Sequence, residues 1–236
     1  MMNEIIRKRK SVRKYEMEKL DHEILEKVRE EIDKVVPLYP DIKYSIEMAN
    51  KTKGLFNIAA PHYLVFGSEK KEGSLENIGF IGQQLDLLFS QMGLGACWLG
   101  ASKPEEMEES SLPFVICMAF GKPKGLLHRN LSEFKRKPLS WISEGTDERL
   151  EAARLAPSGM NLQGWFFVAE EGRIHCYRKK LNPIMGLIYN EMGAIDLGIA
   201  ICHIYKESDT FNFTKLVNAP SKKGYFYMGT VECEKL

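Results

Sequence analysis

The sequence predicts an α+β protein built from two similar halves. The first observation is the order of its elements, which runs helix, strand, long apolar helix, strand, and begins again after a polar stretch at residues 128–146. The second is a pair of apolar helical segments, 81–93 and 192–204, which occupy matching places in the two halves. Helices and strands also alternate in many unduplicated proteins, so element order alone leaves that alternative open.

Periodicity and the positions of glycine and proline define the elements. In the first half we expect helices at 3–9, 20–36 and 77–95 and strands at 60–68 and 112–123. In the second half we expect helices at 146–156 and 190–205 and strands at 165–171, 173–178 and 224–232. Trp165, His62 and His203 lie in apolar runs and are expected in the core.

Composition is that of an ordinary soluble chain. The 236 residues are 44% hydrophobic and 28% charged, and the net charge is +1, so no global charge favours nucleic acid or acidic lipid. We find no apolar signal-peptide core at the N-terminus and no run of roughly 18 apolar residues that would span a membrane. Five cysteines, odd in number and widely spaced, suggest buried thiols, no disulfide framework and a cytoplasmic protein: Cys97, Cys117, Cys176, Cys202 and Cys233.

A dense basic cluster follows the first predicted helix. Residues 7–14, RKRKSVRK, place six cations around Ser11. Like charges this close repel one another unless an anion lies among them. If the chain is extended from Ser11 onward, Arg9, Ser11 and Arg13 converge on one side and suit a phosphate. A solvated basic turn and a nucleic-acid contact are the alternatives, and no recognisable nucleic-acid-binding motif supports the second.

A second polar segment, LAPSGMNLQGW at 155–165, joins a helix to a strand. Pro157 and Gly159 keep it out of regular structure, while Ser158, Asn161 and Gln163 offer both hydrogen-bond donors and acceptors. A planar heterocycle with alternating carbonyls and ring nitrogens needs both donors and acceptors along its edge. A polar surface turn is the alternative.

These motifs together resemble those of the FMN-dependent nitroreductases. The family signature R-x-S-x-R is matched by RKSVR at 9–13, and A-P-S-x-x-N-x-Q-P-W is matched by APSGMNLQGW at 156–165. The family turn G-L-G-x-x-W is matched by GLGACWLG at 93–100, and a basic R-x-P-L segment by RKPL at 136–139. Any one match could arise by chance, whereas their ordered combination is specific.

The departures from the family pattern are informative. The A-P-S motif is missing from the first half, where residues 35–48 read VVPLYPDIKYSIEM, and the R-x-S-x-R motif is missing from the second. Ordinary members are homodimers in which each subunit completes the other's flavin site. The resemblance therefore implies a fused pseudo-dimer with halves at 1–144 and 145–236, mostly antiparallel sheets flanked by helices, one complete site, and no need for a partner subunit. Gly164 replaces the family proline, and Gly100 replaces a common glutamate, which puts the usual nicotinamide contact in doubt.

The resemblance implies an oxidoreductase that passes electrons from NAD(P)H through flavin N5 to a nitroaromatic, quinone or similar electrophilic acceptor. An FMN-binding protein for storage or sensing, without nicotinamide turnover, is the alternative. No side chain is assigned a catalytic role, no metal site is expected, and Cys97 lacks the surroundings of a redox thiol. The implied FMN contacts are Arg9, Ser11, Arg13 and Arg136 at the phosphate, Lys10 at the pyrimidine edge, Trp98, Leu99, Gly100 and Ala101 near N5, and Pro157, Ser158, Asn161 and Gln163 at the ring or ribityl chain.

Overall fold

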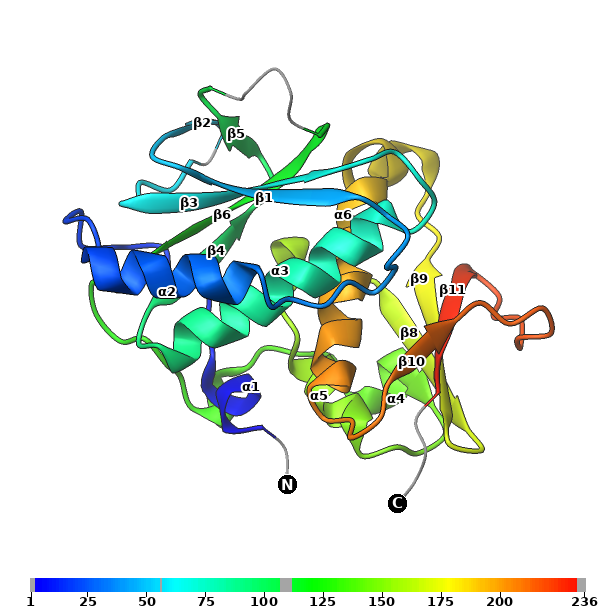
Figure 1. The fold of residues 1–236 in the computed structure, drawn as a ribbon. Helices are drawn as coiled ribbons and strands as arrows, with labels where there is room; N and C mark the ends of the chain where they lie inside the picture. The colour runs from blue at the N-terminus through cyan, green and yellow to red at the C-terminus, as the bar shows by residue number, and fades with distance from the viewer. Residues whose placement is uncertain (1–2, 56, 107–111, 233–236) are drawn as a thin grey trace.

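The computed structural model describes residues 3–55, 57–106 and 112–232. Its N-terminal part has a four-stranded antiparallel sheet in the order β1-β3-β6-β4, drawn at the top of Figure 1. Its strands are β1 (Tyr44–Ala49), β3 (His62–Ser68), β4 (Gly95–Leu99) and β6 (Phe114–Gly121). Strands β2 (Thr52–Gly54) and β5 (Ser102–Pro104) form a small ribbon, and the helices are α1 (Glu4–Lys8), α2 (His22–Ile32) and α3 (Ser74–Gln91).

The C-terminal part has a five-stranded sheet in the order β10-β11-β9-β8-β7. All neighbours in it are antiparallel except the short pair β7 and β8. The strands are β7 (Ser143–Glu144), β8 (Trp165–Glu170), β9 (Arg173–Lys179), β10 (Asn212–Thr214) and β11 (Tyr225–Glu232). The helices are α4 (Leu139–Ile142), α5 (Arg149–Leu155) and α6 (Pro183–Tyr205), with single helical turns η1 (Leu131–Glu133) and η2 (Gly159–Asn161).

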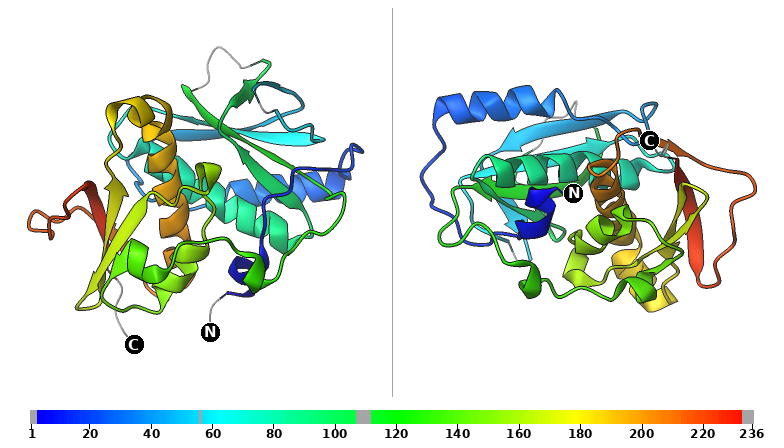
Figure 2. Two further views of the ribbon diagram at one scale, coloured as in Figure 1. Left: turned by 180° about the vertical axis from the view of Figure 1, so that it is seen from behind. Right: turned by 90° about the horizontal axis from the view of Figure 1, so that it is seen from below.

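Helices α3 and α6 cross between the two sheets, as both views of Figure 2 show. The crossing is close enough that a Cβ atom added to Gly79 would lie 2.1 Å from the carbonyl oxygen of Ile195. A Cβ added to Gly198 would lie 2.0 Å from the carbonyl oxygen of Glu76. Both glycines are therefore required for backbone contact, since no larger residue fits there. One hydrophobic cluster, which includes Phe66, Phe80 and Trp165, spans both parts.

Each element predicted from the sequence is present, but several boundaries differ. The helix expected at 77–95 ends at Gln91, Gly93 adopts a left-handed φ of +81°, and the chain enters β4 at Gly95. Trp98 and Leu99, which we expected in a loop, belong to this strand because their backbone pairs with β6. Helix α6 begins at Pro183, earlier than expected, because Pro183 fits the first turn and the Asn182 side chain caps it.

Besides β4, five strands were missed from the sequence: β1, β2, β5, β7 and β10. Four of them have only two or three residues, and β1 is half-buried along its whole length, so none shows the alternation that identifies a strand. Trp165, His62 and His203 are buried as expected. The division into similar halves at 144/145 stays a prediction.

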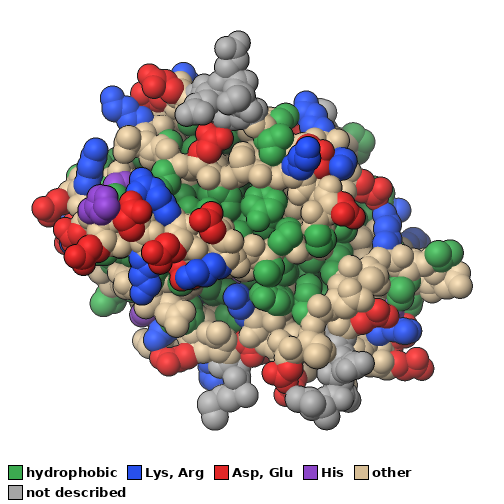
Figure 3. Space-filling model, in the orientation of Figure 1, with side chains coloured by type: hydrophobic (Ala, Val, Ile, Leu, Met, Phe, Trp, Pro, Cys, Tyr) green, Lys and Arg blue, Asp and Glu red, His purple; other side chains and the backbone are tan. Residues whose placement is uncertain are grey.

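The surface and the cysteines agree with the composition. On the face shown in Figure 3, Lys and Arg side chains alternate with Asp and Glu around a central hydrophobic area, so the described part of that face has no continuous basic surface. Within the described ranges, no helix combines the length and apolarity needed to cross a membrane. Cys97, Cys117, Cys176 and Cys202 are buried thiols, and no disulfide joins them, while Cys233 lies outside the described residues.

Candidate functional site

A cavity of about 770 Å³ lies where the N-terminal segment, the end of β4, the loop before β8 and the start of α6 meet. This volume falls within the range of roughly 300 to 1,000 Å³ that is usual for cofactor and small-molecule sites. Segments that are far apart in the sequence therefore converge as the motifs predict. The predicted site residues that line the cavity are Ser11, Arg13, Trp98, Leu99, Gly100, Ala101, Pro157 and Ser158.

Five predicted site residues do not line this cavity: Arg9, Lys10, Arg136, Asn161 and Gln163. Arg9 points inward and is 1% exposed, with its Nε 3.0 Å from Asp86 Oδ2. Its Nη2 donates to Ser11 Oγ at 3.2 Å. The anion that relieves the crowded cations is thus, in part, the protein's own Asp86. Arg9 Nη1 is buried without a hydrogen-bond partner among the described residues, so its hydrogen-bonding capacity is not used within the described protein.

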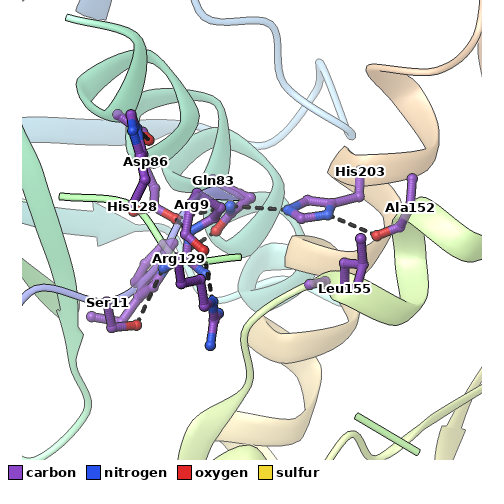
Figure 4. A network of polar contacts seen from close by, with 12 residues as sticks. Arg9, Ser11, Gln83, Asp86, His128, Arg129, Ala152, Leu155 and His203 are labelled. Carbon is purple, nitrogen blue, oxygen red and sulfur yellow. Dashed lines mark hydrogen bonds and ion pairs between the residues drawn. The ribbon is translucent and has the colours of Figure 1, made fainter. Parts of the chain in front are cut away.

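Gln83 on α3 is the centre of the polar network in Figure 4. Its Nε2 donates to Asp86 Oδ2 at 2.9 Å and to His203 Nε2 at 3.1 Å. Its Oε1 accepts from Trp98 Nε1 at 3.3 Å. Because His203 Nε2 must accept, its Nδ1 carries the proton and donates to the Ala152 carbonyl at 2.8 Å. Burial lowers the pKa of His203 to about 3, so this ring is neutral at physiological pH.

The network places Trp98 firmly on the cavity wall. The Trp98 ring also stacks on Phe66, with centroids 5.6 Å apart. A Cβ on Gly82 would lie 2.3 Å from the indole, so this ring needs glycine beside it. Gln83 therefore connects the cavity wall to both long helices, and the sequence alone did not identify it.

Two further arginines, Arg129 and Arg136, crowd the same region, and both lie beside Phe134. The guanidinium carbons of Arg129 and Arg136 lie 3.7 and 5.5 Å from the Phe134 ring centre, and Arg129 Nε donates to the Arg9 carbonyl at 3.0 Å. Burial, and then nearby Arg9, lowers the pKa of Arg129 to about 10. Burial, and then Arg129 and Arg9, lowers that of Arg136 to about 9. With Asp86 as the buried carboxylate beside them, these three cations favour a bound anion.

Arg129 was missed from the sequence because it stands in a polar stretch without motif spacing. Asn161 and Gln163 are also placed differently from our expectation. Arg136 Nη1 donates to Asn161 Oδ1 at 2.7 Å, and Asn161 Nδ2 donates to the Lys135 carbonyl at 2.8 Å. The Lys137 backbone N–H donates to Gln163 Oε1 at 2.7 Å. Through these hydrogen bonds the two amide side chains connect the loop before β8 to the basic segment at residues 135–137.

The loop itself is held in a strained conformation. Met160, Asn161 and Gln163 have φ values of 49°, 59° and 47°, a region that non-glycine residues seldom adopt. The Gln163 backbone N–H donates to Ser158 Oγ at 3.0 Å, which closes the loop on itself. Strain of this kind persists where surrounding contacts fix the backbone, and it is concentrated at functional sites.

Asp196 on α6 is an unexpected carboxyl group in the cavity wall. Its side chain is 3% exposed, and its Oδ1 accepts from the Gly159 backbone N–H at 2.9 Å. Burial raises the pKa of Asp196 to about 7. The available sequence signal was one acid within the apolar run AIDLGIAI at 194–201.

Met192 on α6 fills the space beside Gly100. A Cβ on Gly100 would lie 2.0 Å from Met192 Cε, and a Cβ on Gly159 would lie 2.7 Å from Met192 Cγ. The thioether thus lies between the loop after β4 and the loop before β8. Its place is the one that a side chain at position 100 would occupy.

Comparison with known proteins decides the family. A family model described as "Putative TM nitroreductase" matches residues 1–208 of the 236. The chain belongs to this nitroreductase family. Membership places it among oxidoreductases and confirms the resemblance drawn from the motifs. No functionally curated protein matches the sequence.

One solved structure shows the α+β nitroreductase fold of this chain, and two others are similar over little more than half of it. A protein from Thermotoga maritima, described as a putative nitroreductase, is 23% identical, with a TM-score of 0.64 over 97% of this chain and 90% of its own. A nitroreductase family protein from Clostridium difficile 630 is 17% identical, with a TM-score of 0.47 over 59% of this chain and 96% of its own. An FMN-dependent nitroreductase from Clostridium difficile R20291 is 16% identical, with a TM-score of 0.42 over 56% and 93% respectively.

Proposed function

We propose that this nitroreductase family protein binds FMN in the cavity and transfers electrons from NAD(P)H to a small electrophilic acceptor such as a nitroaromatic or a quinone. The observation that supports it most is the convergence of Ser11 and Arg13, the 98–101 segment and the 157–158 segment on one cavity. Both parts of one chain contribute to this wall. On this proposal a single chain would complete the site without a partner subunit.

The residues present fit FMN in size and in charge. The volume of about 770 Å³ suits a flavin mononucleotide. Ser11 lies on the cavity wall and bonds Arg9, whose buried Nη1 has a hydrogen bond still to make. The phosphate would bind here, with Arg13 from the cavity side and Arg129 and Arg136 behind, because guanidinium groups bind oxyanions tightly. Lys10 would lie nearer the pyrimidine edge.

FMN, when bound, would accept a hydride from NAD(P)H and deliver it to the acceptor. The protein's contribution would be position and electrostatics. Trp98, fixed by Gln83 and Phe66, would hold the segment through Ala101 against the N5 edge. Pro157 and Ser158 would close the opposite side, while Asn161 and Gln163 hold their loop to the basic segment.

One observation favours a second candidate, an FMN-binding protein without nicotinamide turnover. Gly100 has no side chain to offer to a nicotinamide, and Met192 occupies the space where such a side chain would project. A chain of this kind would keep the phosphate and ring contacts while limiting access for NAD(P)H. Binding and turnover therefore need separate experiments.

The binding experiment compares two neighbouring cations. Arg13 lines the cavity, whereas Lys14 is exposed and does not line it. Removal of a charge-assisted phosphate contact costs about 1.5 to 3 kcal/mol, so Arg13→Ala should weaken FMN binding roughly tenfold to a hundredfold. Lys14→Ala should bind FMN like the wild type. Fluorescence titration of the apoprotein with FMN measures both, and equal affinities in the two variants would refute the phosphate assignment.

The turnover experiment uses the FMN-loaded protein under anaerobic conditions. Mixing with NADH or NADPH should bleach the flavin absorbance if hydride transfer occurs. Addition of a quinone should then restore the colour. A yellow protein that neither nucleotide bleaches would support the binding protein instead, and a wild-type protein that takes up no FMN would contradict both candidates.

A further inference from the structure

We infer that Asp196 is the proton donor of this cavity, delivering a proton to the electron acceptor as the acceptor is reduced. This inference rests on the proposed function. It adds a side chain with a catalytic role to a site for which the motifs supplied only cofactor contacts. Its basis is the place, burial and bonding of one carboxyl group.

The first step is the place of Asp196. It lines the same cavity as Gly100 and Ser158, between the two loops proposed to enclose the flavin. Met192, one turn before it on α6, touches both of those loops at the positions of Gly100 and Gly159. An acceptor bound against the flavin in this cavity would therefore lie next to the part of the wall that includes Asp196.

The second step is its bonding. Oδ1 accepts from the Gly159 backbone N–H at 2.9 Å, which fixes the orientation of the carboxyl group. Among the residues that the structure describes, Oδ2 has no hydrogen-bond donor and Asp196 has no ion-pair partner. An unpaired carboxylate is costly at a position buried as deeply as this one, and a protonated carboxyl group is not. The free oxygen is thus available to carry a proton toward the cavity.

The third step is the charge around it. The titratable side chains that share the wall are Arg13 from the N-terminal segment, Cys97 from β4 and Tyr189 from α6. On the packed neighbours, Arg154 of α5 pairs with Glu151, and Arg178 of β9 donates to the Asn190 carbonyl at 3.0 Å. The charges that act on Glu76 of α3 are those of Arg178, Glu72 and Lys215. Burial therefore dominates, and it raises the pKa of Asp196 to about 7. A pKa near the working pH suits a general acid.

The chemistry balances with a quinone as acceptor. Bound FMN would supply one quinone oxygen with a hydride, which carries two electrons and one proton, and the other oxygen would become a phenolate oxygen. The O–H bond of Asp196 breaks, and its proton forms the second O–H bond of the hydroquinone. Asp196 then regains a proton from water. The reductant is the NAD(P)H of the proposed function.

The first test does not depend on activity. The infrared carbonyl band of a protonated carboxyl group should be present in the protein at about pH 5 and should disappear with a midpoint close to pH 7. Asp196→Asn should lack that band. Asp209→Asn, which removes an exposed carboxylate away from the cavity wall, should keep it. A wild-type spectrum with no such titrating band, or a band unchanged in Asp196→Asn, would overturn the inference.

The second test separates the two half-reactions of the FMN-loaded protein. Asp196→Asn should still bind FMN and should still be bleached by NAD(P)H. Its reoxidation by benzoquinone should slow about 10²- to 10⁴-fold, the usual contribution of a positioned acid. Reoxidation by ferricyanide, which takes electrons and no proton, should match the wild type. Asp196→Glu should recover part of the quinone rate, and Asp209→Asn should behave as the wild type.

Two results would overturn the proton-donor role: quinone reoxidation at the wild-type rate in Asp196→Asn, or an equal slowing with ferricyanide. The second would mean that the substitution disturbs electron transfer in general. Failure of the proposed function gives a different result. In that case the wild type binds no FMN or is bleached by neither nucleotide, and the inference falls with it.

Discussion

Asp86 and Asp196 lie on the two crossing helices α3 and α6. Asp86 has partners that hold the fold together, whereas Asp196 has few partners and lines the cavity. Both carboxyl groups are almost fully buried, at 2% and 3% exposure. Asp86 has Arg9 Nε at 3.0 Å and Gln83 Nε2 at 2.9 Å. Asp196 has one backbone N–H, from Gly159.

The difference lies in what compensates burial. Burial raises the pKa of Asp86 as well, but the Arg9 guanidinium and the Gln83 amide oppose that rise. They replace the lost water and stabilise the charge as part of the network that holds the N-terminal segment to α3. Around Asp196 no described side chain does so, and burial raises its pKa to about 7. A buried acid with partners organises a fold, whereas one without them, on a cavity wall, is available for proton transfer.

The largest effect on stability is expected when the cation that pairs with Asp86 is removed. Arg9→Met should cost about 3 to 5 kcal/mol of unfolding free energy, because it leaves a buried carboxylate without its cation. Urea unfolding at neutral pH measures the loss. The double variant Arg9→Met with Asp86→Leu should recover most of it, since no buried charge is then left. A single variant as stable as the wild type would show that the ion pair does not hold the segment.

Asp196 should behave in the opposite way. Its folded pKa of about 7 exceeds its ordinary value of 3.8, so the folded state holds the proton more tightly and loses stability as pH rises from about 4 through 7. Asp196→Asn removes this loss and should be more stable than the wild type at pH 8, by on the order of 2 to 4 kcal/mol. At about pH 4 the two should be nearly equal. Asp86→Asn is the matched control and should lose stability at pH 8, because Arg9 is then unpaired.

The neutral ring of His203 adds a pH dependence of opposite sign. Its pKa is lowered from 6.5 to about 3 by burial, so only the unfolded chain takes up a proton as pH falls below 6.5. Stability should therefore fall by about 2 kcal/mol between pH 6.5 and pH 5. The slope of Asp196 opposes it in this range, and the lowered pKa values of His62 and His128 add to it, so urea unfolding of Asp196→Asn is compared with and without His203→Gln. If both variants lost the same stability in acid, the His203 ring would not be neutral in the fold.

The sequence was enough to predict the family and the strongly periodic elements. The motifs at 9–13, 93–100 and 156–165 predicted the family. Residues from all three line one cavity, and the FMN contacts assigned to them stay a prediction. Helices and strands with strong periodicity were also predicted. Short strands and β4 were not, because their pairing with β6 and with each other depends on partners far away in the chain.

The partners of the polar side chains could not be read from the sequence either. The sequence shows that Arg9 needs an anion, but not that Asp86 on a later helix supplies it. Asn161 and Gln163 were expected to face a ligand because amides suit one, and they suit the backbone at 135 and 137 equally well. Asp196 was overlooked, since one acid in an apolar helix gives no spacing to recognise. Which partner a polar side chain bonds depends on tertiary geometry, and residue type alone does not determine it.

The smallest effect is expected at Gly100, where the cavity wall is held by a flexible side chain and not by a network. A Cβ there meets the terminal methyl group of Met192, which can rotate away, so Gly100→Ala should cost less than about 1 kcal/mol. Gly164→Ala is the control, since a Cβ at that position meets nothing within 4 Å. Gly100→Ala combined with Met192→Ala should relieve the contact, and a double-mutant cycle in urea measures the coupling. Two fully additive substitutions would mean that Met192 does not press on this loop. The cavity wall near Asp196 would then not be held by an adaptable side chain, and it would no longer differ in this way from the rigid network around Asp86.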